Sequence, residues 1–160
     1  MMKSKRKKVL LIEPNYANKY PPIGLMKLST YYKNLGGWDV TFYKGDLKTF
    51  VIERIADRCI EDFEKTDKSI DWWLKRDEFV EYIKTRKKET VEKIAIDRSD
   101  MELILLAKLT EWKDFYWKGI WKKEPEWDRV GVTTLFTFYW DITVDTINFA
   151  KLLVKKKKDL

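Results

Sequence analysis

The spacing of apolar residues in the first part of the chain predicts a strand, a helix and a second strand. Residues 8–13 are apolar between two charged ends, as in a strand that is buried on both faces. A segment rich in Pro and Asn follows over 14–22, and apolar residues then recur at helical spacing through 23–35. A Gly-Gly pair ends that helix, and the aromatic and β-branched residues of 38–43 favour a strand. Together these segments predict a βαβ unit.

The middle of the chain has helical spacing, and strand character returns only near its end. Residues 47–64 carry apolar side chains every three or four positions, and the strongly charged stretch 67–126 continues in the same way. Strand character returns over 127–140, which ends in a long run without charged residues, so we expect this strand to be central in the sheet. Asp141 or Thr143 can then cap a last helix.

Strands that alternate with helices predict a parallel sheet with right-handed crossovers. The expected fold class is α/β: a partial doubly wound (flavodoxin/Rossmann-like) three-stranded parallel sheet with a helical insertion. Doubly wound sheets commonly have five or six strands, so we expect the chain to be the front half of such a domain. The expected organisation is a basic tail, a first βαβα part, the helical insertion, a third strand with its helix, and a second basic tail, over 1–8, 9–59, 60–126, 127–154 and 155–160.

The positive charge of the chain lies at its two ends. The sequence has 33 Lys and Arg against 26 Asp and Glu, a net charge of +7, and the basic residues gather in 1–8 and 155–160. The long middle part is therefore close to neutral. Binding along a phosphate backbone needs cations gathered on a folded surface, so tails alone give weak support, and nucleic acid is not expected as a partner.

The use of cysteine and histidine excludes several kinds of chemistry. The one cysteine, Cys59, rules out an internal disulfide and a multi-cysteine zinc or iron–sulfur site made by this chain alone. The absence of histidine removes Ser-His-Asp and Cys-His catalysis and any imidazole ligand to a metal. A single cysteine favours a reducing, cytoplasmic compartment. The apolar run 9–12 is too short for a signal peptide or a membrane span, so no membrane partner is expected.

Ligands of open α/β sheets bind beyond the carboxyl ends of the strands. The predicted elements place the loop 14–24, the turn 44–46 and the segment 133–137 at that edge. Neither a glycine-rich dinucleotide motif nor a Walker-type phosphate loop occurs in them. Asp46 stands where an acidic residue meets a ribose in a dinucleotide site, although a polar residue in a turn is the more frequent explanation.

The chain opens with Val9-Leu-Leu-Ile-Glu-Pro-Asn-Tyr16, followed by Tyr20-Pro-Pro-Ile-Gly-Leu25 and a helix. This opening resembles the cobalamin-binding-like domain at the front of many radical S-adenosylmethionine (radical SAM) proteins, in which Tyr-Pro-Pro-x-Gly-Leu follows an apolar strand and an Asn/Pro-rich turn. The stretch 127–151 is similar to the third strand and helix of the same family, whereas 60–126 match it only loosely.

The resemblance implies that the chain forms one wall of a cavity for cofactor and substrate and is not catalytic by itself. The partner would be the C-terminal radical SAM barrel, which this chain lacks. No catalytic or metal-binding residue is expected here. The expected cofactor-binding residues are those of the carboxyl edge: Pro14, Asn15, Tyr16, Tyr20, Pro21, Pro22, Gly24, Leu25, Asp46, Thr133 and Thr134.

The Tyr-Pro-Pro-Ile-Gly-Leu segment has a physical interpretation apart from the family. Two prolines fix the backbone of the loop, Gly24 permits the close approach of a backbone or ligand, and Leu25 begins the buried face of the helix. The segment would then form a rigid rim. Alternatively, the prolines only start a helix, and Asn15 and Tyr16 only end the strand.

The sequence also departs from the family. Radical SAM enzymes hold a four-iron cluster with three cysteines of a Cys-x-x-x-Cys-x-x-Cys motif, which a single cysteine cannot do. The Asp-x-His-x-x-Gly motif of some cobalamin proteins is absent as well. We therefore expect no cofactor on this chain alone. The resemblance implies a 4Fe-4S cluster and S-adenosylmethionine for the parent protein and leaves cobalamin open.

A second function is compatible with the sequence. The aromatic stretch 112–121 is interleaved with lysines and could stack bases or bind a partner, although such a stretch more often packs a helix on its own domain. Cys59 lies at a helical position among apolar residues and is expected in the core. The alternative is thus a stand-alone interaction module that binds an acidic partner or nucleic acid through its basic tails and aromatic insertion.

Overall fold

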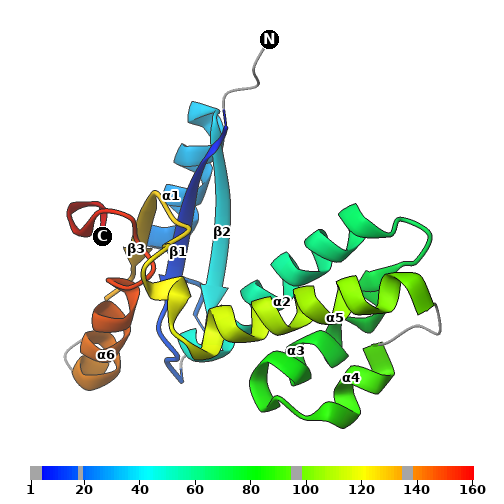
Figure 1. Cartoon of the computed structure of the whole chain (residues 1–160). Helices are drawn as coiled ribbons and strands as arrows, with labels where there is room; N and C mark the ends of the chain where they lie inside the picture. The colour runs from blue at the N-terminus through cyan, green and yellow to red at the C-terminus, as the bar shows by residue number, and fades with distance from the viewer. Residues whose placement is uncertain (1–4, 18–19, 95–98, 135–138) are drawn as a thin grey trace. The chain divides into compact units, whose positions relative to one another are not determined.

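Three parallel strands form an open sheet in the computed structural model, which describes residues 5–17, 20–94, 99–134 and 139–160 (Figure 1). The strands are β1 (Lys7–Glu13), β2 (Trp38–Lys44) and β3 (Arg129–Val132), and their order is β2-β1-β3. The other elements of the described chain are helical. This arrangement confirms the predicted fold class, a partial doubly wound sheet of three parallel strands with a helical insertion.

The central strand is β1. The uncharged run near the C-terminus had suggested the third strand instead, and that prediction is wrong. Val9 pairs with Val40 of β2 on one side and with Arg129 of β3 on the other. All residues from Val9 to Glu13 are buried, as a central strand requires, whereas β3 spans only four residues at an edge. The predicted strand 127–140 is therefore too long: Trp140 already belongs to a helix, and 135–138 lie outside the described residues.

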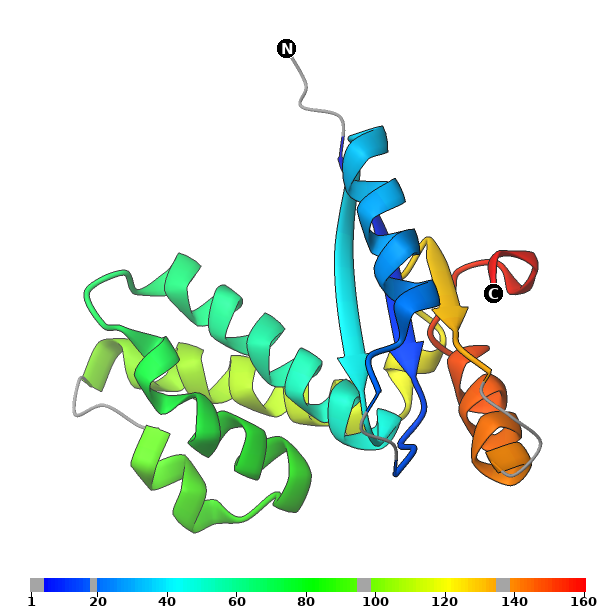
Figure 2. The same ribbon diagram turned by 180° about the vertical axis from the view of Figure 1, so that it is seen from behind.

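Helix α1 (Ile23–Leu35) connects β1 to β2 and packs on one face of the sheet, as Figure 2 shows. Leu25 and Tyr32 are its buried residues, and they form a core with Val9 and Leu11 of β1. The helix ends at Gly36 and Gly37, whose backbone φ angles are 68° and 70°. Glycine adopts this left-handed conformation without a Cβ clash, which explains the Gly-Gly pair between helix and strand.

The chain leaves β3 through α6 (Trp140–Ala150) and then returns to the outer side of β3. Val154 forms an isolated parallel bridge with Trp127. The backbone N–H of Trp127 donates to Leu153 O at 3.3 Å, and that of Lys155 donates to Trp127 O at 2.9 Å. Residues 153–155 thus lie parallel to the segment at Trp127 through a single bridge, before the short helix η4 (Lys157–Asp159).

Internal packing divides the chain into two units. Unit 1 comprises residues 1–47 and 124–160 and contains the sheet, whereas unit 2 comprises 48–123 and is helical. Unit 2 therefore includes nearly all of α2, so these boundaries fall at 47/48 and 123/124, where the sequence suggested 59/60 and 126/127. The helices of the insertion are α2 (Leu47–Thr66), η1 (Trp72–Lys75), α3 (Arg76–Thr85), α4 (Lys88–Ile94), α5 (Ser99–Trp117) and η2 (Ile120–Lys122).

Unit 2 has its own aromatic core. The ring of Phe63 lies 5.1 Å from that of Trp72 and 5.0 Å from that of Phe79, both in edge-to-face geometry, which aromatic pairs prefer. Cys59 is buried in this unit, and burial raises the pKa of its thiol well above the usual range. A thiol that stays protonated is a poor nucleophile, so Cys59 is a core residue, as its helical position indicated.

Candidate functional site

The loops that follow the three strands meet around the end of β1. The backbone N–H of Gly45, in the turn after β2, donates to Glu13 O at 3.4 Å. The backbone N–H of Thr133, just after β3, donates to Ile12 O at 3.0 Å. Both bonds fix neighbouring segments to the last residues of the central strand. The carboxyl edge of the sheet thus gathers the segments in which the sequence placed a ligand site.

Tyr16 connects the loop after β1 to the segment after β3 and to α6. Its side chain is buried, and its hydroxyl shares a hydrogen bond with the hydroxyl of Thr143 and donates to Thr133 O at 3.3 Å. Its ring lies 5.0 Å from the ring of Tyr139. The hydroxyl of Thr143 in turn donates to the carbonyl of Tyr139 at 2.9 Å. Tyr16 is thus a brace between elements, and its buried ring is not available to a ligand.

The Tyr-Pro-Pro-Ile-Gly-Leu segment forms the start of α1. Backbone N–H groups of Ile23 and Met26 donate to the carbonyls of Pro21 and Pro22, so the prolines open the first helical turn. Tyr20 and Pro21 are exposed, Tyr20 by 81%. A Cβ atom at position 24 would meet nothing within 4 Å, so nothing in the described fold requires a glycine there.

The remaining predicted site residues divide between surface and core. Leu25 is buried against the sheet and therefore serves the core. Asn15, Asp46 and Thr134 are exposed, whereas Pro14 is buried and Pro22 and Thr133 are half-buried. The backbone carbonyl of Asp46 accepts a hydrogen bond from the hydroxyl of Tyr43 at 2.9 Å, which stabilises the turn after β2.

Glu13 is a residue at this edge that the predicted site did not include. It is the last residue of β1, its side chain is 1% exposed, and its Oε1 lies 3.3 Å from Nζ of Lys44, the last residue of β2. A buried carboxylate needs such a partner, because leaving water without one is costly. The signal in the sequence was a charged residue that ends an apolar strand next to Pro14.

The described residues of the carboxyl edge do not fit a corrin ring. In a sheet of this order the ligand crevice lies between the ends of β1 and β3, where the strand order reverses. Tyr16 is buried at that place, bonded to Thr133 and Thr143. The chain also has no imidazole to offer to cobalt, and its one cysteine is buried. We therefore derive no step through cobalamin or through an iron–sulfur cluster on this chain.

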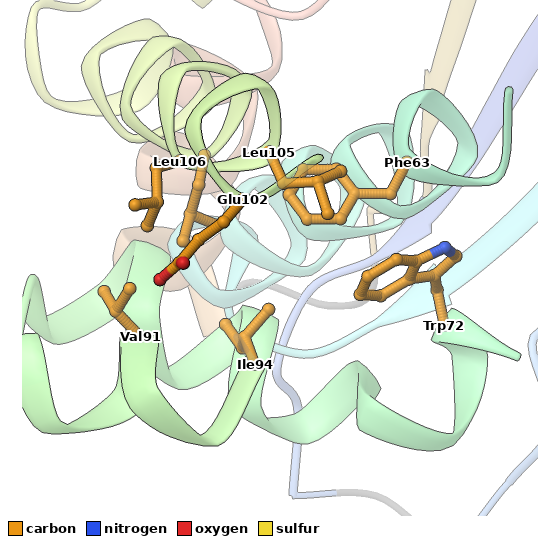
Figure 3. A pocket seen from close by; sticks show the side chains of 8 residues that line it. Phe63, Trp72, Val91, Ile94, Glu102, Leu105 and Leu106 are labelled. Atoms are coloured by element: carbon orange, nitrogen blue, oxygen red, sulfur yellow. The ribbon is translucent and has the colours of Figure 1, made fainter. Parts of the chain in front are cut away.

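Unit 2 has an apolar pocket, seen in Figure 3. Its cavity measures only about 10 Å³, roughly the space that one water molecule needs, and is therefore too small for a ligand. Apart from Glu102, its lining is apolar: Phe63, Trp72, Val91, Ile94, Leu105, Leu106 and Leu109. We interpret it as a packing defect between helices rather than a binding site.

The aromatic stretch of the insertion is used for packing within unit 2. The indole N–H of Trp112 donates to Asp62 at 3.2 Å, and that of Trp117 donates to Ile83 O at 2.8 Å. The guanidinium of Arg86 lies 4.0 Å from the ring of Trp117, and Trp121 is buried. These contacts use part of the aromatic stretch for packing, while Trp117 stays 44% exposed.

The described residues contain no group of three or more acidic or cysteine side chains that could hold a metal ion. Among the described helices, none has the length and the apolar character that a membrane crossing requires. Comparison of the chain with family models, with curated proteins and with solved structures finds no significant match.

Proposed function

We propose that this chain is the N-terminal cobalamin-binding-like part of a cytoplasmic radical SAM protein and is not catalytic by itself. In this proposal its carboxyl edge forms one wall of a cavity that the C-terminal radical SAM barrel closes. The observation that carries the proposal is the strand order β2-β1-β3, combined with the Tyr-Pro-Pro-Ile-Gly-Leu segment at the carboxyl edge. Flavodoxin-like sheets have the order 2-1-3-4-5, of which this is the first part.

The bridge between Trp127 and Val154 supports the same proposal. It places the chain beside β3 and parallel to it, at the position of the fourth strand in that order. Further parallel strands on this side would extend the sheet from three towards the five of a flavodoxin-like domain.

The geometry of the edge suits a wall better than a reaction centre. Tyr16 holds the loop after β1 against α6, and the prolines stiffen the entry to α1. The exposed Tyr20, Pro21 and Gly24 then form a rim that another domain or a substrate can approach. Gly24 fits this role, since the surface above it is open.

Sequencing the reading frame beyond codon 160 tests the proposal. We expect two further strand-like apolar runs and then a Cys-x-x-x-Cys-x-x-Cys motif. A stop codon directly after Leu160 would contradict the proposal, and so would a continuation without clustered cysteines.

A variant of the complete protein tests the role of the rim. Gly24→Leu should leave the fold of this chain intact, because a Cβ there would meet nothing within 4 Å, and it should lower the activity of the parent enzyme at least tenfold by obstructing the wall. Lys27→Leu, at an exposed position of the same helix, is the matched control and should retain activity. Equal activity of the two variants would refute the assignment of this surface.

A further inference from the structure

The described residues of the two basic tails, 5–8 and 155–160, meet at the amino-terminal edge of the sheet. Asp128 joins them: its Oδ2 accepts a hydrogen bond from the backbone N–H of Lys8 at 2.8 Å, and its Oδ1 accepts one from Nζ of Lys155 at 2.8 Å. Lys155 is also fixed through its backbone to Trp127. Figures 1 and 2 show the C-terminal segment, in red, beside β3. The tails are thus part of one folded surface.

This surface, which we call the basic edge, lies at the opposite end of the strands from the candidate site. It comprises residues 5–8, Arg129 and residues 155–158, all of them Lys or Arg. Part of the charge is neutralised, since Arg6 pairs with Asp39, Lys8 with Glu126 and Lys155 with Asp128. The described residues of the basic edge nevertheless keep a clear excess of positive charge. The sequence alone could not show that these cations lie together on one folded surface.

Aromatic rings lie directly beside these cations. Nζ of Lys7 is 5.5 Å and the guanidinium of Arg129 is 5.4 Å from the ring centre of Trp38, the first residue of β2. Arg129 also donates to the hydroxyl of Tyr32 at 3.1 Å. Tyr31, next to that ring at 5.5 Å, is 56% exposed. The rings extend from the end of α1 to the start of β2.

We propose that the basic edge binds single-stranded nucleic acid. The lysines would follow the phosphates, and the exposed ring of Tyr31 would stack on a base, the combination used by proteins that bind single strands. The carboxylates of an acidic peptide would pair with the lysines but would leave the ring of Tyr31 without a role. Tyr32 and Trp38 are packed against each other at 5.0 Å and half or fully buried, so they are held too firmly to insert into a lipid bilayer. The inference does not depend on the function proposed above.

Fluorescence anisotropy of the full chain with labelled oligouridylate and oligothymidylate tests this inference. We expect binding that weakens with salt and exceeds the binding to a duplex of equal length. Changing Lys156, Lys157 and Lys158 together to Gln should weaken binding at least tenfold at 0.1 M salt. The same change should flatten the plot of log K against log salt by about 0.7 for each lost phosphate contact. Tyr31→Ala should weaken binding about fivefold or more.

Charge alone is controlled by a matched variant in unit 2, in which Lys84, Lys87 and Lys88 are changed to Gln. These side chains are exposed, and changing them to Gln removes the same charge as the triple change at 156–158. This variant should nevertheless bind like the wild type. Circular dichroism verifies that all variants are folded. The inference is overturned if neither oligonucleotide binds, if both lysine variants lose binding equally, or if Tyr31→Ala has no effect. Tighter binding to polyglutamate or to phosphatidylserine vesicles would also overturn it.

Discussion

Single side chains join segments that are far apart in this sequence. Tyr16 reaches Thr143, 127 positions further on, and Asp62 accepts hydrogen bonds from Lys108 at 2.9 Å and from Trp112 at 3.2 Å. Each of these contacts is partly or fully buried, where a hydrogen bond contributes more than on the surface. Substitutions at these residues therefore report how firmly the elements are held together.

Tyr16→Phe should lower the free energy of unfolding by about 1 kcal/mol, because it removes the buried hydroxyl and keeps the ring. Thr143 retains its bond to Tyr139, which limits the loss. Urea unfolding measures the difference, and Tyr20→Phe, at an 81% exposed position, is the control with little expected effect. Equal unfolding midpoints for the two variants would contradict the bracing role of Tyr16.

Asp62→Asn should reduce the sensitivity of the protein to acid. Partial burial raises the pKa of Asp62, but hydrogen bonds from Lys108 and Trp112 outweigh it and hold the pKa below its ordinary value. The charged form therefore stabilises the fold above about pH 4, the usual value for an unfolded Asp, and this contribution is lost as the pH falls through the lower folded pKa.

Urea unfolding at pH 7 and pH 3 measures this effect. The loss of stability between the two pH values should be smaller in Asp62→Asn than in the wild type. Glu61→Gln, at the neighbouring exposed position, should leave it unchanged. An identical loss in Asp62→Asn and the wild type would show that the ion pair with Lys108 does not contribute.

Among the elements, helix α1 is anchored in the fold by only a small part of its apolar surface. Leu25 and Tyr32 are its buried residues, whereas Leu28 is 43% exposed on the same helix. Leu25→Ala should therefore cost about 2–5 kcal/mol, as the removal of buried methyl groups from a core does. Leu28→Ala should cost less than about 1 kcal/mol. Thermal unfolding compares them, and similar costs would mean that the helix is not anchored through Leu25.

The individual helices and strands could be predicted from the sequence, but which of them lie side by side in the fold could not. The apolar run of β1 and the Gly-Gly end of α1 carry their own signals, so these elements were predicted nearly to the residue. The lack of charge after Val130 suggested a central strand, yet position in a sheet depends on pairing with distant residues, and Val9 pairs on both sides. The same reason hid the bracing role of Tyr16, the burial of Glu13 and the meeting of the basic tails.

At the scale of the molecule, unit 1 carries several exposed apolar side chains on α1 and the edge strand β2. They are Ile23, Met26, Leu28, Tyr31, Leu35 and Phe42. Apolar patches of this kind favour association. Size-exclusion chromatography of the isolated chain should therefore show elution that shifts with concentration, and Leu28→Lys with Leu35→Lys should suppress the shift. A sharp monomer peak at all concentrations would contradict this expectation.

The central position of β1 also sets an order of events in folding. Its register with β2 joins Glu13 to Lys44, 31 positions apart, whereas its link to Asp128 spans 120 positions. Closing the longer loop costs more entropy before any contact can compensate for that cost. We therefore expect β1, α1 and β2 to assemble first. Stopped-flow kinetics should then show that Val40→Ala slows folding and that Val130→Ala mainly speeds unfolding, and the reverse pattern would exclude this order. The carboxyl edge is therefore completed only in the last step, when β3 arrives.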